Sequence, residues 1–523
     1  MSKRKAIPVI DLFAGPGGLG EGFSSLHNSD GARLFRIAVS IEKDPIAHKT
    51  LRLRSFYRQF DLGRVPNGYY DFLRSSEVNQ DTRWLMLKGK FPNETKAAEL
   101  EARNAELGND DPEEIDTWIR SALGGSDTWV LIGGPPCQAY SIAGRSRNSG
   151  NPKYVPEKDE RQHLFKKYLR ILATHLPPVF IMENVKGLLS ATLQDGPIFE
   201  RILNDLRQPR AALRGKQRNG TARYRIFSLV KPGEGETLAL KDFVVATERY
   251  GIPQARHRVI LLGVREDLGN MIPDILKPQS PVTAYDVLHG LPSLRSGLSQ
   301  EADDMDRWQS KIAGAPWKRW FKEPMEDNQH QAEKHIEAAL SKIRRKQLSR
   351  GAEFSPGQPT ISWGKSWYLD RKLGGVCNHS TRSHIPSDLH RYFYAAVFAQ
   401  TLHRSPTLAD FPHELLPHHK NVRVALNGGN FSDRFRVQLA DRPATTITSH
   451  ISKDGHYYIH YDPTQCRSLT VREAARLQTF PDNYFFCGPR TSQYTQVGNA
   501  VPPLLARQIA EIVRAVLRKA GSD

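Results

Sequence analysis

The chain contains 523 residues, of which 39% are hydrophobic, and this length exceeds what one hydrophobic core usually supports, so at least two domains are expected. Its 74 lysines and arginines outnumber the 56 acidic residues, and the net charge of +18 favours a polyanionic partner over a merely soluble basic protein. The four cysteines form no Cys-x-x-Cys pair, which argues against a disulfide framework or a zinc knuckle and favours the reducing cytoplasm.

Neither a signal sequence nor a membrane span is predicted. The chain starts with basic residues before an apolar run, but Asp11 interrupts this run too early for a signal sequence. No stretch reaches the roughly 20 apolar residues that a membrane-spanning helix requires. The sequence therefore indicates a protein without a membrane partner.

The first part of the chain alternates β-rich runs with helical segments. The β-rich runs are IPVIDLF, RIAVSI, TWVLIG, PVFIMENV, DFVVAT and RVILLGV. This alternation predicts an α/β fold in which a doubly wound, Rossmann-like sheet forms a first domain over residues 1–267. The charged stretch 94–117 is predicted to be solvated and helical, as part of a helical insertion that spans about 52–124.

The first predicted strand leads into a glycine-rich turn and a helix. Gly15, Gly17 and Gly20 match the spacing G-x-G-x-x-G, which is a weak signal alone. The second predicted strand ends at Glu42, 22 residues after Gly20, where a carboxylate can accept hydrogen bonds from two ribose hydroxyls. The stretch therefore predicts a nucleoside cofactor and leaves NAD and S-adenosyl-L-methionine open as alternatives.

Reactive side chains are predicted to gather at one edge of this sheet. Cys137 follows the strand TWVLI within GGPPCQAYS, where glycine and proline shape a loop. Glu183 follows the strand PVFIM, and Arg256 and Arg258 lead into RVILLGV with a spacing that puts both on one side of an extended chain. Because open α/β sheets bind ligands at the carboxyl ends of their strands, a thiol, a carboxylate and two cations are expected to converge there.

The remainder of the chain has a different character. Residues 268–445 are rich in Pro, Gly, Trp and basic residues without clear alternation, which predicts a second, smaller domain. Thr470 and Glu473 form a predicted capping box at the start of a helix. A last helix is predicted after Pro502, with an apolar face made by Leu505, Ile509, Ile512, Val513 and Val516. The segment 446–523 is expected to return to the first domain.

The chain resembles the DNA (cytosine-5) methyltransferases of the bacterial restriction-modification or defence type. The matching segments are DLFAGPGGLGEGF, GGPPCQAYS, FIMENV, GIPQARHRV, LTVREAARLQTFPDNY and QVGNAVPP, and they occur in the family's order. The resemblance implies an enzyme that transfers a methyl group from S-adenosyl-L-methionine to C5 of a cytosine. Since that carbon is hidden in a duplex, the base must be flipped out of the stack.

The implied reaction assigns roles to the reactive side chains. A thiolate that adds at C6 turns the cytosine ring into an enamine-like species able to attack the methyl group, and Cys137 is the expected nucleophile. Glu183 is expected to protonate or hydrogen-bond N3. By the family pattern, Arg258 stabilises the charge at the base O2 and Arg256 braces the site. No residue is predicted to remove the C5 proton, so water or hydroxide is expected to do so.

The resemblance also implies binding residues. The expected cofactor contacts are Phe13, Gly15, Gly17, Gly18, Leu19, Glu42, Asn499 and Val501, while the adenine-contacting acid falls in an expanded region where Asp110 and Asp111 are candidates. The expected DNA contacts are Ser141 and Arg145 in the loop after Cys137, together with Gln254, Lys365, Arg382 and Thr448. No metal site is predicted.

Some side chains favour a packing role. Cys377, Cys466 and Cys487 are predicted to be small buried residues. Trp363 and Trp367 stand among basic residues in the second domain, yet packing is favoured over DNA contact for both. This second domain, by its position, resembles the family's target-recognition domain.

Three functions remain open. The first is a DNA methyltransferase that acts on double-stranded DNA in the cytoplasm, associated with the nucleoid and with companion restriction or defence proteins. The second is a tRNA cytosine-5 methyltransferase, against which the long recognition segment argues. The third is a catalytically silent DNA-binding scaffold, which would not require Cys137, Glu183 and Arg258 together.

Overall fold

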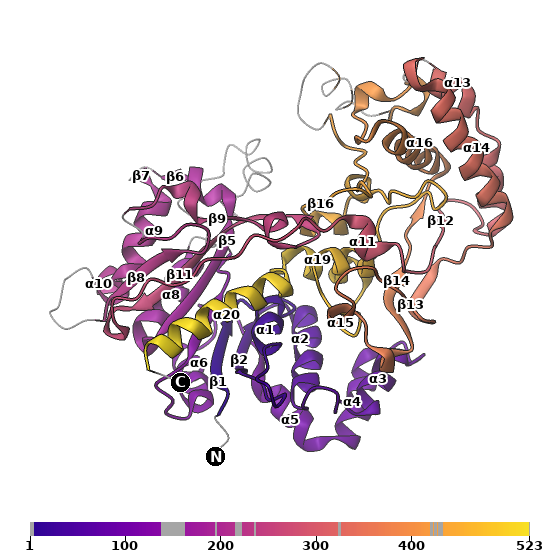
Figure 1. The fold of residues 1–523 in the computed structure, drawn as a ribbon. Helices are drawn as coiled ribbons and strands as arrows, with labels where there is room; N and C mark the ends of the chain where they lie inside the picture. Colours follow the sequence, from indigo (N-terminus) through magenta and orange to yellow (C-terminus); the bar gives the residue numbers. More distant parts are fainter. Residues whose placement is uncertain are drawn as a thin grey trace.

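The structure is a computed structural model in which two lobes face each other (Figure 1). The described residues are 5–136, 163–193, 196–214, 222–234, 237–322, 326–418, 422, 426 and 432–521. Cys137, Ser141 and Arg145 therefore lie outside the described residues. The first lobe holds a sheet with helices on both faces, the second is drawn in orange, and the yellow C-terminal segment crosses back to the first (Figure 1).

Within the described residues, the central sheet has eight strands in the order β3-β2-β1-β4-β5-β11-β8, with β9 paired to β11. The strands are β1 (Ile7–Leu12), β2 (Phe35–Glu42), β3 (Ala102–Asn104), β4 (Val130–Gly133), β5 (Val179–Val185), β8 (Tyr224–Ser228), β9 (Val244–Ala246) and β11 (His257–Arg265). Strands β3, β2, β1, β4 and β5 run parallel, and β11 is antiparallel to its neighbours. The chain winds outward in both directions from β1 and β4, which confirms the predicted doubly wound sheet.

Helices cover both faces of this sheet. One face packs against α6 (Pro112–Leu123), α8 (His163–His175) and α9 (Ile198–Arg207). The other face packs against α1 (Gly18–Ser24) and α20 (Pro503–Lys519). Each of the β-rich runs predicted from the sequence contains a strand of the sheet. Strands that are buried on both faces need continuous apolar residues, and such runs are visible in the sequence.

The charged stretch 94–117 is only partly helical and only partly exposed to solvent, whereas its sequence predicts a solvated helix. Helices α5 (Pro92–Glu101) and α6 include most of it, but β3 lies between them and pairs with β2 as an edge strand. Leu107, Ile115 and Ile119 are buried in the core of the first lobe. The prediction of a solvated helix was therefore wrong for this part, because a few apolar residues among many charges suffice to anchor it to the sheet.

Further helices extend the first lobe beside the sheet. They are α2 (Pro45–Arg58), α3 (Asn67–Arg74) and α4 (Gln80–Lys90). Their aromatic core includes Phe56, Tyr69 and Trp84, and it continues into Cys377 of the second lobe and Phe485 of the C-terminal segment. This shared core ties the helices after β2 to both distant parts of the chain.

The second lobe is built around one helix that is buried on almost all sides. That helix, α16 (Pro386–Leu402), packs with α12 (Met305–Ala313), α13 (Trp317–Lys322) and α14 (Gln329–Arg345). The shorter elements are β10 (Gln254–Ala255), α11 (Ala284–Leu288), β12 (Gly297–Leu298), β13 (Gly351–Pro356), α15 (Lys365–Tyr368), β14 (Gly375–Ser380), β15 (Ser383–His384) and β16 (Ala444–Thr445). In the first lobe, β6 (Thr192–Leu193), β7 (Gly196–Pro197) and α10 (Pro209–Arg214) complete the set.

The C-terminal segment confirms two sequence predictions. Thr470 and Glu473 form the capping box of α18 (Val471–Leu477), which is followed by α19 (Arg490–Asn499). The predicted apolar face of α20 is buried against α1. At the contact, a Cβ on Gly22 would lie 2.5 Å from the Pro503 carbonyl oxygen, so only glycine permits this close helix approach. Among the described residues, no helix combines the length and apolarity needed to cross a membrane.

Candidate active site

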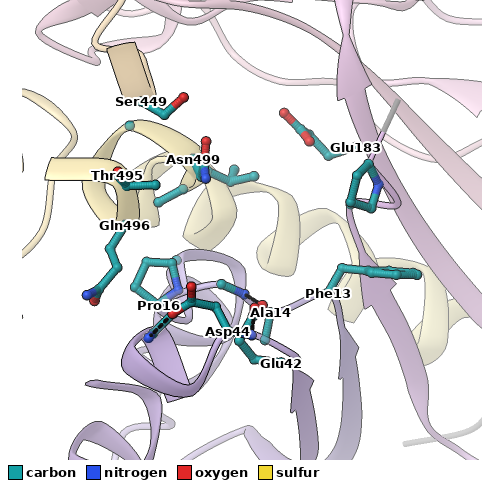
Figure 2. A pocket seen from close by; sticks show the side chains of 18 of the residues that line it. Phe13, Ala14, Pro16, Glu42, Asp44, Glu183, Ser449, Thr495, Gln496 and Asn499 are labelled. Atoms are coloured by element: carbon teal, nitrogen blue, oxygen red, sulfur yellow. Dashed lines mark hydrogen bonds between the residues drawn. The ribbon is translucent and has the colours of Figure 1, made fainter. Parts of the chain in front are cut away.

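A cavity of about 750 Å³ lies at the carboxyl ends of β1, β2, β4 and β5, between the glycine turn and α19 (Figure 2). The sequence-predicted residues that line it are Phe13, Gly15, Gly18, Leu19, Glu42, Glu183, Arg256, Arg258, Thr448, Asn499 and Val501. Gly134, Pro135 and Pro136, which directly precede Cys137, also line it. Segments from both ends of the chain therefore meet around one cavity of the size that holds a small-molecule ligand.

The glycine turn after β1 forms the floor of one half of the cavity. Phe13, Gly15 and Gly17 have φ angles of 56°, 56° and 96°, so the turn passes three times through the left-handed region. A Cβ on Gly18 would lie 2.3 Å from the Val501 carbonyl oxygen, which brings the start of α1 against the segment after α19. The turn is thus shaped by backbone geometry that other residues would strain.

Glu42 stands at the end of β2 beside this turn. Its carboxylate accepts hydrogen bonds from the backbone N–H groups of Gly15 and Asp44, both at 2.8 Å. Burial raises the pKa of Glu42 above its usual value. Each carboxylate oxygen keeps a second lone pair, so the group can hold the turn and still accept a bond from a ligand hydroxyl.

Glu183 and Arg258 form an ion pair in the other half of the cavity. Glu183 Oε1 lies 3.0 Å from Arg258 Nε, and each side chain is 15% exposed. Glu183 points from β5 into the cavity, opposite Ser449 and Asn499 (Figure 2). Burial lowers the pKa of Arg258, while the carboxylate acts in the opposite direction. A carboxyl group and a guanidinium are thus fixed side by side facing the same space, where both can bond to one planar ligand.

Arg256 braces the wall of the cavity opposite the sheet. Its guanidinium donates to the carbonyl oxygens of Ile447 at 2.7 Å and Gly498 at 3.1 Å. Burial lowers the pKa of Arg256 well below its usual range, and the neighbouring Arg258 adds to this effect. Both predicted arginines therefore line the cavity, as their spacing suggests, but only Arg258 contacts Glu183.

The structure adds lining residues that the sequence reasoning missed. Glu106 and Leu107 follow the unexpected strand β3 and line the cavity, whereas the candidates Asp110 and Asp111 do not. Asp110 accepts a hydrogen bond from the Glu106 backbone, and Asp111 caps α6. The three-residue strand β3 is too short to be recognised by periodicity, so no sequence signal marked Glu106.

A second missed residue is Asn184, next to the acid Glu183 on β5. Its side chain donates to the Pro135 carbonyl oxygen at 3.1 Å. This bond joins the end of β5 to the segment that immediately precedes Cys137. Asn184 therefore helps to fix where that segment leaves the sheet.

The predicted DNA-contacting residues occupy different positions. Thr448 lines the cavity, and its hydroxyl lies 2.9 Å from that of Tyr458. Lys365 is exposed on α15, away from the cavity lining. Arg382 is half-buried and donates to the Ile451 carbonyl oxygen. Of these three residues, only Thr448 belongs to the cavity itself.

Gln254 has a position that does not suit contact with DNA. The side chain is 0% exposed and bonds to the Ile447 N–H at 2.6 Å and the Leu477 carbonyl oxygen at 3.3 Å. Both ends of the amide are therefore bonded within the protein: they connect β10 to Ile447, just before η12 (Ser449–Ser452), and to Leu477, the last residue of α18. The expectation of a DNA contact is therefore corrected to a structural role.

Several other side chains are packed as expected. Cys377, Cys466 and Cys487 are buried, which confirms the prediction for all three. Trp363 and Trp367 are partly buried against a core shared by the second lobe and the C-terminal segment, and Trp367 Nε1 donates to the Thr479 carbonyl oxygen. Packing rather than exposure accounts for both tryptophans.

Comparison with known proteins identifies the family. Residues 93–209 and 241–514 match the family described as C-5 cytosine-specific DNA methylase. The chain is 34% identical over 527 aligned positions to the type II methyltransferase M.Bpa9945I of Bacillus paralicheniformis, covering 97% of this chain and 99% of the relative. It is 27% identical to the DNA (cytosine-5-)-methyltransferase M.ApeKI of Aeropyrum pernix, with coverage of 76% and 83%.

A solved structure supports the fold. The protein described as a DNA modification methyltransferase encoded within an Escherichia coli prophage superposes with a TM-score of 0.52 at 19% identity, covering 98% of this chain and all of that one. The family match covers most of the chain, and it includes motif residues that line the cavity, such as Glu183, Arg258 and Asn499. The chain therefore belongs to the C-5 cytosine-specific DNA methylase family.

Proposed function

We propose that this chain transfers a methyl group from S-adenosyl-L-methionine to C5 of a cytosine that is flipped out of a specific duplex DNA site. The observation that carries the proposal is the placement of the Glu183–Arg258 pair and the Glu42 turn in one cavity. The Glu183–Arg258 pair suits a pyrimidine, and the turn at Glu42 suits a nucleoside cofactor. Such a protein would work at the nucleoid, with companion restriction or defence proteins of the kind that accompany type II methyltransferases.

The residues present fit the cofactor. S-adenosyl-L-methionine, when bound, supplies a methyl group on a sulfonium centre that accepts electrons from carbon. Glu42 retains lone pairs for ribose hydroxyls, and the glycine turn permits close approach of a ligand to its backbone. Asn499 and Val501 line the cavity from the opposite side and would enclose the methionine part. These residues bind and orient the cofactor but take no part in bond making.

The chain's own groups would carry out the ring chemistry. The Cys137 thiolate adds to C6 while Glu183 gives a proton to N3, so C5 becomes nucleophilic and takes the methyl group. Water or hydroxide then removes the C5 proton, the C6–sulfur bond breaks to restore the thiolate, and N3 returns its proton to Glu183. Arg258 holds the carboxyl group of Glu183 and donates to the base O2, where charge develops.

Catalysis and DNA recognition are expected to reside in different parts of the chain. We infer that residues 1–267 and 446–523 carry the chemistry, because their described parts supply the cavity lining. Residues 268–445 would then read the DNA sequence as a target-recognition domain.

The most direct test of the activity supplies methyl-labelled S-adenosyl-L-methionine with duplex DNA or with tRNA. The expected product is 5-methylcytosine at one recurring DNA sequence, located by bisulfite sequencing. Label in tRNA and none in DNA would contradict the proposal and favour the RNA-methylating alternative. DNA binding without any transfer would favour a silent scaffold.

Replacing Glu42 by alanine is expected to raise the dissociation constant for S-adenosyl-L-methionine by about 10- to 100-fold. The reason is that a hydrogen bond to a charged group contributes about 1.5–3 kcal/mol. Isothermal titration calorimetry without DNA measures the effect. Asp111→Ala is the control, because Asp111 caps α6 outside the cavity lining and should leave the affinity unchanged. Equal affinities for Glu42→Ala and the wild type would remove Glu42 from the cofactor site.

Arg382 and Arg490 form a basic pair that fits the DNA backbone. Arg382 bonds to Ile451 in η12, a segment that also lines the cavity, and lies 4.2 Å from the centre of the Tyr494 ring. Burial lowers the pKa of Arg490, and the nearby charge of Arg382 adds to this effect. Neither arginine forms an ion pair with a carboxylate in the part of the chain that the structure describes. Two half-buried cations without a counter-ion favour a phosphate partner.

Removing either charge, by Arg382→Gln or Arg490→Gln, is expected to reduce the salt dependence of DNA binding. The slope of log affinity against log salt should fall by about 1 for each phosphate that the protein no longer neutralises. Fluorescence anisotropy at several salt concentrations measures this slope. Arg120→Gln, which removes an exposed charge from α6 in the first lobe, outside the cavity lining and the proposed recognition domain, is the matched control and should keep the wild-type slope. A wild-type slope in all three variants would contradict the assignment of both arginines.

A further inference from the structure

Tyr484 connects the cofactor turn to a distant part of the chain. Its side chain is 0% exposed, and its hydroxyl donates to the Pro16 carbonyl oxygen in the glycine turn. A Cβ on Gly17 would lie 3.0 Å from this hydroxyl, so glycine leaves the space that the tyrosine tip occupies. The shape of the turn thus depends on a residue that lies 468 positions away from Pro16 in the sequence.

Arg54 on α2 holds Tyr484 in this position. Its guanidinium lies 3.7 Å from the centre of the Tyr57 ring and 4.8 Å from that of Tyr484. The same group makes two bonds to Glu21 of α1, at 2.9 and 2.5 Å, and one to Asn483 Oδ1 at 3.0 Å. A buried cation with this many partners cannot move independently, since breaking one contact leaves a charge unsatisfied.

The network continues to the second lobe through the residue before Tyr484. Asn483 Nδ2 donates to Asp370 Oδ2 at 2.7 Å, and the Tyr70 hydroxyl donates to the same oxygen at 2.6 Å. The Tyr69 hydroxyl donates to the Asn483 carbonyl oxygen at 2.8 Å. Adjacent residues of one short segment therefore contact the cofactor turn, the helices after β2 and the second lobe.

We propose that Tyr484 is a positioning residue for the cofactor: its hydroxyl fixes the Pro16 carbonyl and thereby the turn that supplies Phe13 and Gly15 to the cavity. This inference rests on the proposed function, because the ligand concerned is S-adenosyl-L-methionine. Tyr484 does not line the cavity. Its influence reaches the ligand only through the backbone of the turn, which distinguishes it from the contact residue Glu42.

The test is Tyr484→Phe, which removes one oxygen atom and keeps the packed ring. We expect the dissociation constant and the KM for S-adenosyl-L-methionine to rise by about 3- to 10-fold, as the loss of one buried hydrogen bond allows. The kcat at saturating cofactor should stay within about twofold of the wild type, because Glu183 and Arg258 are untouched. Calorimetry measures the dissociation constant, and initial rates of DNA methylation give the KM and the kcat.

Tyr224→Phe is the matched control. It removes another buried hydroxyl, which donates to the Pro177 carbonyl oxygen at 2.9 Å from the edge strand β8, outside the cavity lining. This variant should lose comparable thermal stability and keep the wild-type cofactor affinity. A purely structural role of Tyr484 would give both variants the same affinity, which would overturn the inference. A fall in kcat with an unchanged KM would overturn it too. Failure of the wild type to bind S-adenosyl-L-methionine would instead reject the proposed function on which it rests.

Discussion

Replacing Cys137 by alanine is expected to abolish methyl transfer, with a loss of at least about 10⁴-fold in kcat. C5 of cytosine is a poor nucleophile, and the covalent bond from sulfur to C6 is what would make it reactive. Cofactor affinity should stay close to the wild-type value, because the turn and Glu42 are unchanged. Single-turnover assays with labelled cofactor and calorimetry measure the two quantities.

The control for this experiment is Cys466→Ala, which removes a buried thiol from the core of the second lobe. It is expected to retain methyl transfer, although removal of the buried sulfur atom lowers the thermal stability somewhat. Substantial transfer by Cys137→Ala would show that another group, or no nucleophile at all, activates the ring. An equal loss in both cysteine variants would point to unfolding rather than chemistry.

Replacing Glu183 by glutamine is expected to lower kcat by about 10²- to 10⁴-fold. Glutamine has nearly the same shape and can still form a hydrogen bond to N3, but it cannot transfer a proton. The affinity for DNA should therefore change much less than the rate. Steady-state rates and anisotropy with the same duplex separate the two effects.

Glu248→Gln provides the control, because Glu248 is also paired with a β11 residue, His257, at 2.8 Å but does not line the cavity. It should leave kcat unchanged within about twofold. If Glu183→Gln raises KM and preserves kcat, the carboxyl group serves binding and not proton transfer. That outcome would remove the acid from the proposed mechanism.

The sheet and the edge that bears the cavity were predictable from sequence because both depend on local patterns. Apolar runs such as PVFIM mark strands, and the residue that follows each run falls at the ligand-binding edge. This rule alone brings Glu42 and Glu183 to one cavity. The resemblance to a known family then assigned their chemistry, which local patterns cannot do.

What the sequence did not reveal depends on contacts between distant residues. Gln254 precedes Arg256 in a motif, yet it bonds to Leu477 and is buried, which no local pattern indicates. Tyr484 reaches Pro16 across almost the whole chain. The three-residue edge strand β3 is defined by its pairing with β2. Polar contacts at such separations follow from the packed fold and leave no periodic signal.

The central claim is that a sulfur atom bonds transiently to C6 of an extruded cytosine. A duplex that carries 5-fluorocytosine at the methylated position, incubated with the wild-type protein and S-adenosyl-L-methionine, tests it most directly. With fluorine in place of hydrogen at C5, there is no proton to remove after methyl transfer. The elimination that releases the thiolate is therefore blocked, and the thiolate should remain attached. The account predicts a stable protein–DNA adduct that carries the methyl group, with the modified peptide mapped by mass spectrometry to Cys137. Absence of the adduct on a duplex that is methylated normally when it carries cytosine, or attachment at another residue, would contradict the account.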